Sequence, residues 1–141
     1  MKFIAPSDQL AEDWRPGVKT ELKAAARLGA ETLCVFEQHS EPGMGAPEHH
    51  HPEDEEVILV IEGHADFTFG AETHRLDCGT AVIVPAGVRH SFVNVGEDTL
   101  RTVAIFAAPT PTVVYANSAG ETLAIGANDP LAVSHRTHKP A

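Results

Sequence analysis

The sequence is poor in cysteine, in aromatic residues and in basic residues. Its 141 residues include 2 cysteines, 1 tryptophan and 1 tyrosine, and 10 lysines and arginines stand against 20 aspartates and glutamates, for a net charge of -10. Cys34 and Cys78 form no Cys-x-x-Cys pair, so the sequence offers neither a redox motif nor a zinc ribbon. The acidic balance argues against a nucleic acid or an anionic membrane surface as the main partner.

Long apolar runs are also absent. No stretch of the sequence approaches the roughly 18 apolar residues of a membrane-spanning helix. The first residues lack the run of about 7 to 15 apolar residues that a secretory signal needs. We therefore expect a cytoplasmic protein without a membrane partner.

The composition of the chain fits one folded domain. Hydrophobic residues make up 43% and charged residues 21%, a balance that is typical of globular proteins and excludes a disordered chain. Domains usually span about 100 to 200 residues. We expect residues 1–141 to form a single domain, with residues 110–141 as a C-terminal extension.

Short apolar runs alternate with turn residues along most of the chain. Each run has the length of a strand and is rich in β-branched or aromatic residues, and Gly, Pro, Asn or Asp separates it from the next. The expected strands are 32–39, 57–61, 65–69, 81–84, 91–95 and 102–107, with two shorter ones at 112–115 and 121–125. This spacing predicts an all-β protein, either a sandwich or a barrel.

Residues 20–28 conflict with this pattern. They are strong helix formers with an apolar stripe, so local propensity predicts a helix. The segment precedes six expected strands in a short chain, so a strand that overrides local propensity is the alternative.

Residues 57–61 are apolar on both faces of the expected strand. A strand with one wet face alternates apolar and polar residues, so we expect both faces of this strand to be covered. The second cover is either another copy of the chain, which would make a homodimer, or a second layer within one subunit.

Histidine is the residue that the chain has in excess, with 9 copies. Side chains two residues apart on an extended chain point the same way, so His49 and His51 face one side and His50 the other. Glu56 begins the strand that follows, and His90 begins another strand later in the chain. Three neutral imidazoles and one carboxylate suit a first-row transition metal, whereas the nitrogen content disfavours calcium and magnesium. The alternative for residues 48–56 alone is a solvated acidic loop.

Two spaced motifs strengthen the metal interpretation. Residues 79–94 read glycine, five residues, Pro-x-Gly, two residues, His90, three residues and Asn94. Residues 43–63 read glycine, five residues, His49-x-His51, four residues, Glu56, six residues and glycine. The intervening residues 64–78 suit one hairpin that turns near Gly70. These patterns resemble the two motifs of the cupin superfamily, and every defining position is met.

The resemblance has definite implications for fold and site. It implies a double-stranded β-helix, a jelly-roll barrel of two antiparallel sheets, with the metal ligands at its waist. Carried over residue by residue, the ligands are His49, His51, Glu56 and His90, holding one divalent transition metal: iron, manganese, nickel, zinc, cobalt or copper. Asn94 is expected to bond to the backbone rather than to the metal.

The other histidines receive simpler interpretations. A solvated or rim position is expected for His50, His64, His74, His135 and His138. His39 ends an expected strand, and the sequence does not decide whether it faces the interior. A supporting role beside the ligands therefore stays open for it.

Two functions compete for such a site. The first is a metalloenzyme that binds an oxygenated small molecule in the barrel and acts as a dioxygenase, isomerase or decarboxylase. The second is a metal-dependent binding or sensing module without turnover, and a storage or structural barrel is the least favoured. An enzyme needs a side chain that can move a proton, for which Glu55, His39, Arg89 and Tyr115 are the candidates.

Overall fold

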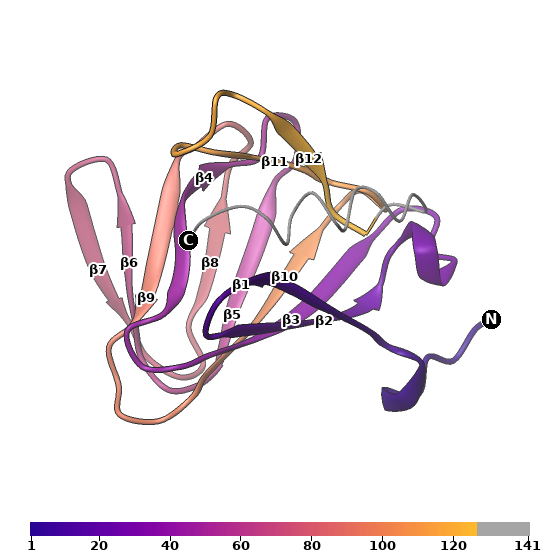
Figure 1. Cartoon of the computed structure of the whole chain (residues 1–141), viewed down its shortest axis with the longest axis horizontal. Helices are drawn as coiled ribbons and strands as arrows, with labels where there is room; N and C mark the ends of the chain where they lie inside the picture. Colours follow the sequence, from indigo (N-terminus) through magenta and orange to yellow (C-terminus); the bar gives the residue numbers. More distant parts are fainter. Residues whose placement is uncertain (127–141) are drawn as a thin grey trace.

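The computed structural model describes residues 1–126, which form two six-stranded antiparallel sheets (Figure 1). The first sheet has the order β1-β2-β3-β10-β5-β8 and the second the order β12-β11-β4-β9-β6-β7. The strands are β1 (Leu10–Arg15), β2 (Val18–Ala24), β3 (Cys34–Ser40), β4 (Gly45–His50), β5 (Glu56–Glu62), β6 (Ala65–Phe69), β7 (Glu72–Leu76), β8 (Ala81–Val84), β9 (His90–Asn94), β10 (Leu100–Phe106), β11 (Thr112–Tyr115) and β12 (Thr122–Ala124). Two short 3-10 turns, η1 (Pro6–Asp8) and η2 (Ala26–Leu28), complete the described part.

The predicted all-β fold of two antiparallel sheets is therefore confirmed. The strands expected at 65–69, 81–84 and 112–115 have the predicted bounds, and β3, β5, β9, β10 and β12 differ from prediction by one or two residues at their ends. The hairpin expected between the two motifs is formed by β6 and β7, which pair from Ala65↔Leu76 to Phe69↔Glu72 around Gly70. Gly70 has φ +57°, a left-handed conformation that a tight turn uses and glycine adopts without strain.

Of the two alternatives for residues 20–28, the strand is correct for residues up to Ala24, and the helix favoured by local propensity is wrong. This segment holds the end of β2, which pairs with β1 on one side and β3 on the other, followed by η2. Val18, Thr20 and Leu22 alternate into the interior and are buried, which is the period of a strand. Two ladders of hydrogen bonds and this burial outweigh the local helix propensity.

The strand β1 was not predicted, because it is polar: Leu-Ala-Glu-Asp-Trp-Arg. Its pairing with β2 is irregular between Glu12 and Arg15, and this irregularity buries two consecutive residues, Trp14 and Arg15. The charged side chain of Arg15 therefore lies inside the barrel, although the polar composition of β1 predicts a position on the surface.

Two apolar clusters fill the space between the sheets. One lies around Trp14, Phe36 and Phe106, and the other around Ile58, Phe67 and Phe92. The histidines expected to bind metal contact both clusters, since the His51 ring lies 4.7 Å from Phe106 and the His90 ring 5.6 Å from Phe67, centroid to centroid. The expected site therefore lies between the two clusters.

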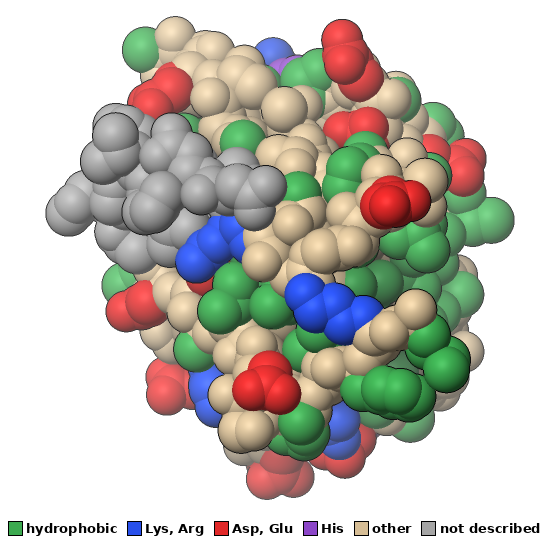
Figure 2. Space-filling view, turned by 90° about the vertical axis from the view of Figure 1, so that its right-hand side faces the viewer, with side chains coloured by type: hydrophobic (Ala, Val, Ile, Leu, Met, Phe, Trp, Pro, Cys, Tyr) green, Lys and Arg blue, Asp and Glu red, His purple; other side chains and the backbone are tan. Residues whose placement is uncertain are grey.

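The outer face of β5 is only partly covered within one chain. Ile58 and Val60 face inward and are buried, while Val57 and Leu59 are half-buried and Ile61 is 37% exposed. A homodimer that covers the outer face stays a prediction. Figure 2 shows a different aspect of the molecule, on which acidic and basic side chains are interspersed among apolar groups.

The C-terminal extension is only partly within the described residues. Its β11 pairs with both β4 and β12, so residues up to Ala124 belong to the second sheet. Residues 127–141, which include His135 and His138, lie outside the described residues. Within residues 1–126, no helix is long and apolar enough to span a membrane.

Candidate metal centre

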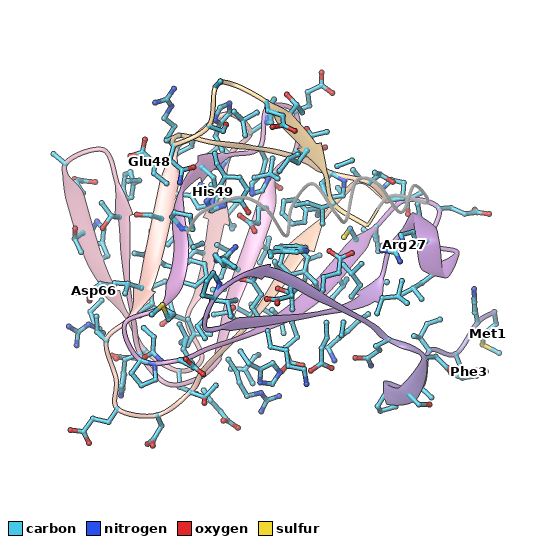
Figure 3. The ribbon with its side chains drawn as sticks, in the orientation of Figure 1. Met1, Phe3, Arg27, Glu48, His49 and Asp66 are labelled. Atoms are coloured by element: carbon cyan, nitrogen blue, oxygen red, sulfur yellow. The ribbon has the colours of Figure 1, made fainter. Side chains whose placement is uncertain are left out.

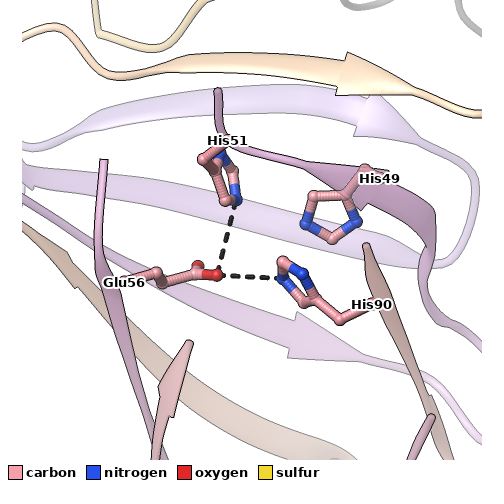
Figure 4. A group of neighbouring side chains, drawn as sticks. All are labelled: His49, His51, Glu56 and His90. Atoms are coloured by element: carbon pink, nitrogen blue, oxygen red, sulfur yellow. Dashed lines mark hydrogen bonds and ion pairs between the residues drawn. The ribbon is translucent and has the colours of Figure 1, made fainter. Parts of the chain in front are cut away.

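The structure brings His49, His51, Glu56 and His90 together between the two sheets (Figure 4). One ligand atom from each lies within 4.8 Å of all the others. His49 is on β4, His51 directly follows that strand, and Glu56 and His90 are the first residues of β5 and β9. His49 is the direct cross-strand partner of His90, which fixes the distance between those two rings. Figure 3 shows His49 inside the barrel, while the neighbouring Glu48 is exposed.

The turn before β9 connects the two halves of the site. Gly87 donates its backbone N–H to the carbonyl of His51 at 2.8 Å, so the turn that precedes His90 is tied to the segment that carries His51. Gly87 has φ +81°, which a residue with a Cβ adopts only with strain. The glycine of the second motif therefore aligns the ligands of both motifs.

Each of the three histidines is oriented by a main-chain carbonyl. Nδ1 of His49 lies 2.7 Å from the carbonyl oxygen of Pro47. The corresponding distance is 2.8 Å from His51 to Thr112 and 2.9 Å from His90 to Val88. A carbonyl only accepts, so each Nδ1 carries the hydrogen and donates it. In the neutral ring, Nε2 then keeps its lone pair, which is the form that binds a metal.

Glu56 is the anionic member of the cluster. Its Oε1 lies 3.1 Å from Nε2 of His90 and 3.4 Å from Nε2 of His51. Nε2 of His51 is buried and makes no hydrogen bond among the described residues, although Nδ1 of the same ring is held by Thr112. The neighbour of this Nε2 is the Glu56 carboxylate at 3.4 Å, and a buried nitrogen that makes no hydrogen bond is costly, so a metal ion between the imidazoles and the carboxylate would satisfy it. The donor set and its orientation therefore fit a transition metal.

Burial and mutual charge shift the pKa values of these groups. Burial, together with the neighbouring His90 and His51, lowers the pKa of His49 to about 3. Burial alone would raise the pKa of Glu56, but the nearby histidines lower it to about 2. Burial opposes protonation of His51 too, yet the Glu56 carboxylate raises its pKa above the ordinary value. At neutral pH, His49 is therefore a neutral donor and Glu56 an anionic one.

The space beside the four residues is small and mostly apolar. A cavity of about 30 Å³ borders His49, His51 and Glu56, which is enough for a group the size of one or two waters. Most of its walls are apolar side chains from both sheets, with Trp14 and Phe36 among them. Four of its other residues are polar, namely Arg15, Gln38, Thr102 and Tyr115.

Of the four predicted candidates for proton transfer, the structure places Tyr115 at the site. Tyr115 is 7% exposed, and its ring lies 5.7 Å from the ring of His49, its cross-strand partner. Glu55 is exposed. Arg89 is exposed as well and pairs with Glu48 at 3.6 Å. His39 points to the outer face of the first sheet, beside Glu21 and Glu37, so a supporting role beside the ligands is wrong.

Asn94 and the other histidines of residues 1–126 lie outside the cluster of four. His50 is half-buried on the face of β4 opposite His49 and His51, and His64 and His74 are exposed, as expected. Asn94 donates to the carbonyls of Ser40 and Asp98 and accepts from Gly96, which confirms its structural role. Sequence reasoning missed Arg15 and Gln38, because a lone arginine or glutamine in a strand carries no spacing signal.

Comparison with known proteins agrees with this geometry. Residues 36–106 match the family model described as a cupin domain. Polyketide synthase CurC from Streptomyces cyaneus is 31% identical over 103 residues, which are 73% of this chain and 64% of CurC, so the chain spans just under two thirds of that protein.

Two solved structures are also similar. The polyketide cyclase RemF from Streptomyces resistomycificus aligns with a TM-score of 0.65 and 26% identity over 79% of each chain. Oxalate decarboxylase from Bacillus subtilis aligns with a TM-score of 0.67 and 25% identity over 72% of this chain and 28% of that one. The family match covers half of the sequence, and the neighbours share its double-stranded β-helix. The chain therefore belongs to the cupin family.

Proposed function

We propose that this protein is a metal-dependent enzyme that binds an oxygenated small molecule through two adjacent oxygens inside the barrel. The observation that carries the proposal is the orientation of the ligands: three carbonyls hold Nδ1 of the histidines, so three Nε2 atoms and the Glu56 carboxylate face a common point. Such a set of donors holds iron, manganese, nickel, cobalt, copper or zinc.

The residues around this point have separate tasks. A bound divalent metal supplies Lewis acidity, which polarises substrate oxygens, and with iron it supplies dioxygen chemistry. His49, His51, His90 and Glu56 would hold it. Each of the four residues is less than 8% exposed, so bulk water is excluded from the site. The Tyr115 hydroxyl is the group placed to give or take a proton at a substrate oxygen.

The relatives favour a polycarbonyl substrate of the polyketide type. CurC and RemF are named a polyketide synthase and a polyketide cyclase, and chains of that class carry oxygens in the 1,3-relation that chelates a metal. A cavity of about 30 Å³ admits only the reacting oxygens, so the rest of such a chain needs movement of the cavity walls.

The experiment joins metal analysis with turnover. Protein reconstituted with each candidate metal is incubated with 3,5-dioxohexanoate, and mass spectrometry distinguishes loss of water, loss of carbon dioxide and uptake of oxygen. We expect one metal per chain and many turnovers per site with the native metal.

Variants of the ligands test the site itself. His51→Ala and His90→Ala should each strip the metal and leave a folded barrel, because each removes one of four donors. His50→Ala is the matched control, since its side chain lies on the other face of β4. Elemental analysis and circular dichroism provide the readouts. One metal per chain retained by both ligand variants would contradict the site.

A non-catalytic binding or sensing module is the second candidate function. Two observations favour it: the cavity is small, and Tyr115 alone of the four predicted proton-transfer candidates borders it among the described residues. Binding of 3,5-dioxohexanoate at one equivalent, without conversion under any of the metals, would select this alternative.

A further inference from the structure

Arg15 is a buried cation beside the candidate metal centre. It is 5% exposed and lines the same cavity as His49, His51 and Glu56. It reaches this position from the end of β1, because the irregular pairing of that strand turns Trp14 and Arg15 both inward. A charged side chain is rarely buried to this extent without a partner of opposite charge.

The described partners of Arg15 are all uncharged groups. Its Nε–H donates to the carbonyl of Gly45 and its Nη2 donates to Oε1 of Gln38 at 3.3 Å, and Tyr115 borders the same cavity. Within residues 1–126, no carboxylate lies within ion-pair distance of its guanidinium. Burial lowers the pKa of Arg15, but a guanidinium stays charged at any physiological pH.

The charges around the cavity do not balance once a metal is bound. A divalent metal and Arg15 together carry three positive charges, and Glu56 supplies one negative charge. Uncompensated charge in an apolar surrounding is unfavourable. A guanidinium has five N–H groups, and the hydrogen bonds to Gly45 and Gln38 use two of them, so N–H groups remain that can donate to a further acceptor.

We propose that Arg15 is a binding residue for an anionic pair of oxygens, either a carboxylate or the enolate of a 1,3-dicarbonyl compound, held between the guanidinium and the metal. The inference rests on the proposed function and narrows its substrate to an organic anion. Charge-assisted hydrogen bonds from a guanidinium fork to two oxygens are among the stronger polar contacts in proteins. Arg15 would also stabilise an enolate relative to its ketone, because only the enolate carries the charge.

The test uses the Co²⁺-loaded full chain and isothermal titration calorimetry. Malonate is the carboxylate probe, acetylacetone at a pH where its enolate forms is the enolate probe, and imidazole is a neutral metal ligand. We expect Arg15→Gln to weaken binding of one or both anions about tenfold or more, to leave the affinity for imidazole within about twofold, and to leave the affinity for Co²⁺ unchanged or higher, because a positive charge beside the metal is removed. The probe that loses affinity identifies the source of the anion.

Two further variants separate binding from structure. Arg75→Gln, at an exposed arginine that pairs with Asp66 on β6, is the matched control and should change none of the affinities. Arg15→Lys keeps the charge but not the fork, so it should recover part of the anion affinity and lower the preference for malonate over acetate. If Arg15→Gln does not fold, the proposal is tested on Arg15→Lys alone. A preference for malonate over acetate that equals the wild-type preference overturns the proposal.

The outcomes distinguish this inference from the proposed function. Wild-type protein that binds no Co²⁺ would contradict the metal site, and the anion titrations are then made on metal-free protein. Equal anion affinity of folded wild type and Arg15→Gln, with or without Co²⁺, overturns the role of Arg15 and leaves the metal site standing.

Discussion

At the scale of the residue, the three site histidines differ in how they respond to protons, although they share one backbone arrangement. His49 is held neutral by burial and by the two other rings, whereas His51 is drawn toward protonation by Glu56. A metal therefore meets an unprotonated Nε2 at His49, whereas at His51 it competes more strongly with a proton. Metal affinity should fall as the pH falls, since protons compete for the same nitrogens.

The lowered pKa of His49 predicts how the stability of the metal-free protein depends on pH. The unfolded chain takes up a proton on this ring below its ordinary pKa of 6.5, whereas the folded chain does so only near 3, so stability falls as the pH falls through this interval. Between pH 6 and 4.5, the contribution is on the order of 1 kcal/mol per pH unit. Urea denaturation of wild type and His49→Gln should show a shallower slope in the variant.

The two other shifted groups do not interfere in this window. The raised pKa of His51 contributes stability that is fully present below pH 6.5 and is lost only as the pH rises through its folded value. The lowered pKa of Glu56 contributes stability that is lost only below its ordinary pKa of 4.5. His74→Gln, at an exposed histidine, is the control. An equal slope in wild type and His49→Gln would contradict the neutral state of His49.

At the scale of the element, the pairing of β4 with β9 sets the distance between His49 and His90. Gly45 permits this pairing, because a Cβ at that position would lie 2.1 Å from the backbone oxygen of Phe92 on β9. Atoms never approach that closely, so a side chain here would force the two strands apart.

Gly45→Ala should therefore lower both the stability and the metal affinity of the protein. We expect about 2 kcal/mol of lost unfolding free energy, in the range measured for overpacked positions, and weaker metal binding by competition with a chelator. Gly96→Ala is the control, since a Cβ there meets Asn94 Oδ1 at an ordinary 3.4 Å. Wild-type stability and affinity in Gly45→Ala would show that the strands do not depend on this contact.

The elements also show what could be predicted from the sequence. Strands with alternating or continuous apolar residues are predicted with nearly correct bounds, and residue spacing together with the resemblance to the cupin motifs groups His49, His51, Glu56 and His90. The polar strand β1 is missed because its pairing with the adjacent β2, and not its composition, makes it a strand. Local propensity favours a helix at residues 20–28, but pairing with β1 and β3 makes residues up to Ala24 a strand. Arg15 was missed for the same reason, since its burial depends on an irregular strand pair.

At the scale of the whole molecule, the outer face of the first sheet is the surface that bears on the expected homodimer. Val57 and Leu59 on β5 are half-buried, and Ile83 on the adjacent edge strand β8 is 67% exposed. The residues that face the same way on β10, Val103 and Ile105, are half-buried and apolar as well. A contiguous apolar surface of this kind is typical of an interface between subunits.

We predict that the protein sediments as a dimer at micromolar concentration and that Ile83→Lys shifts it toward the monomer, because the charge would be buried in the interface. Phe3→Ser replaces another exposed apolar residue, outside this sheet, and should leave the dimer intact. Sedimentation velocity provides the measurement. A wild-type monomer throughout that range would contradict the prediction.

The carbonyl partners of the three histidines have a consequence for how the site tolerates mutation. Pro47, Val88 and Thr112 contribute main-chain oxygens, which every amino acid possesses. Substitution of these three residues therefore changes side chains without deleting the acceptors that orient the rings. A change of side chain at any of these three positions should leave the rings of His49, His51 and His90 oriented as they are, provided that the backbone keeps its course.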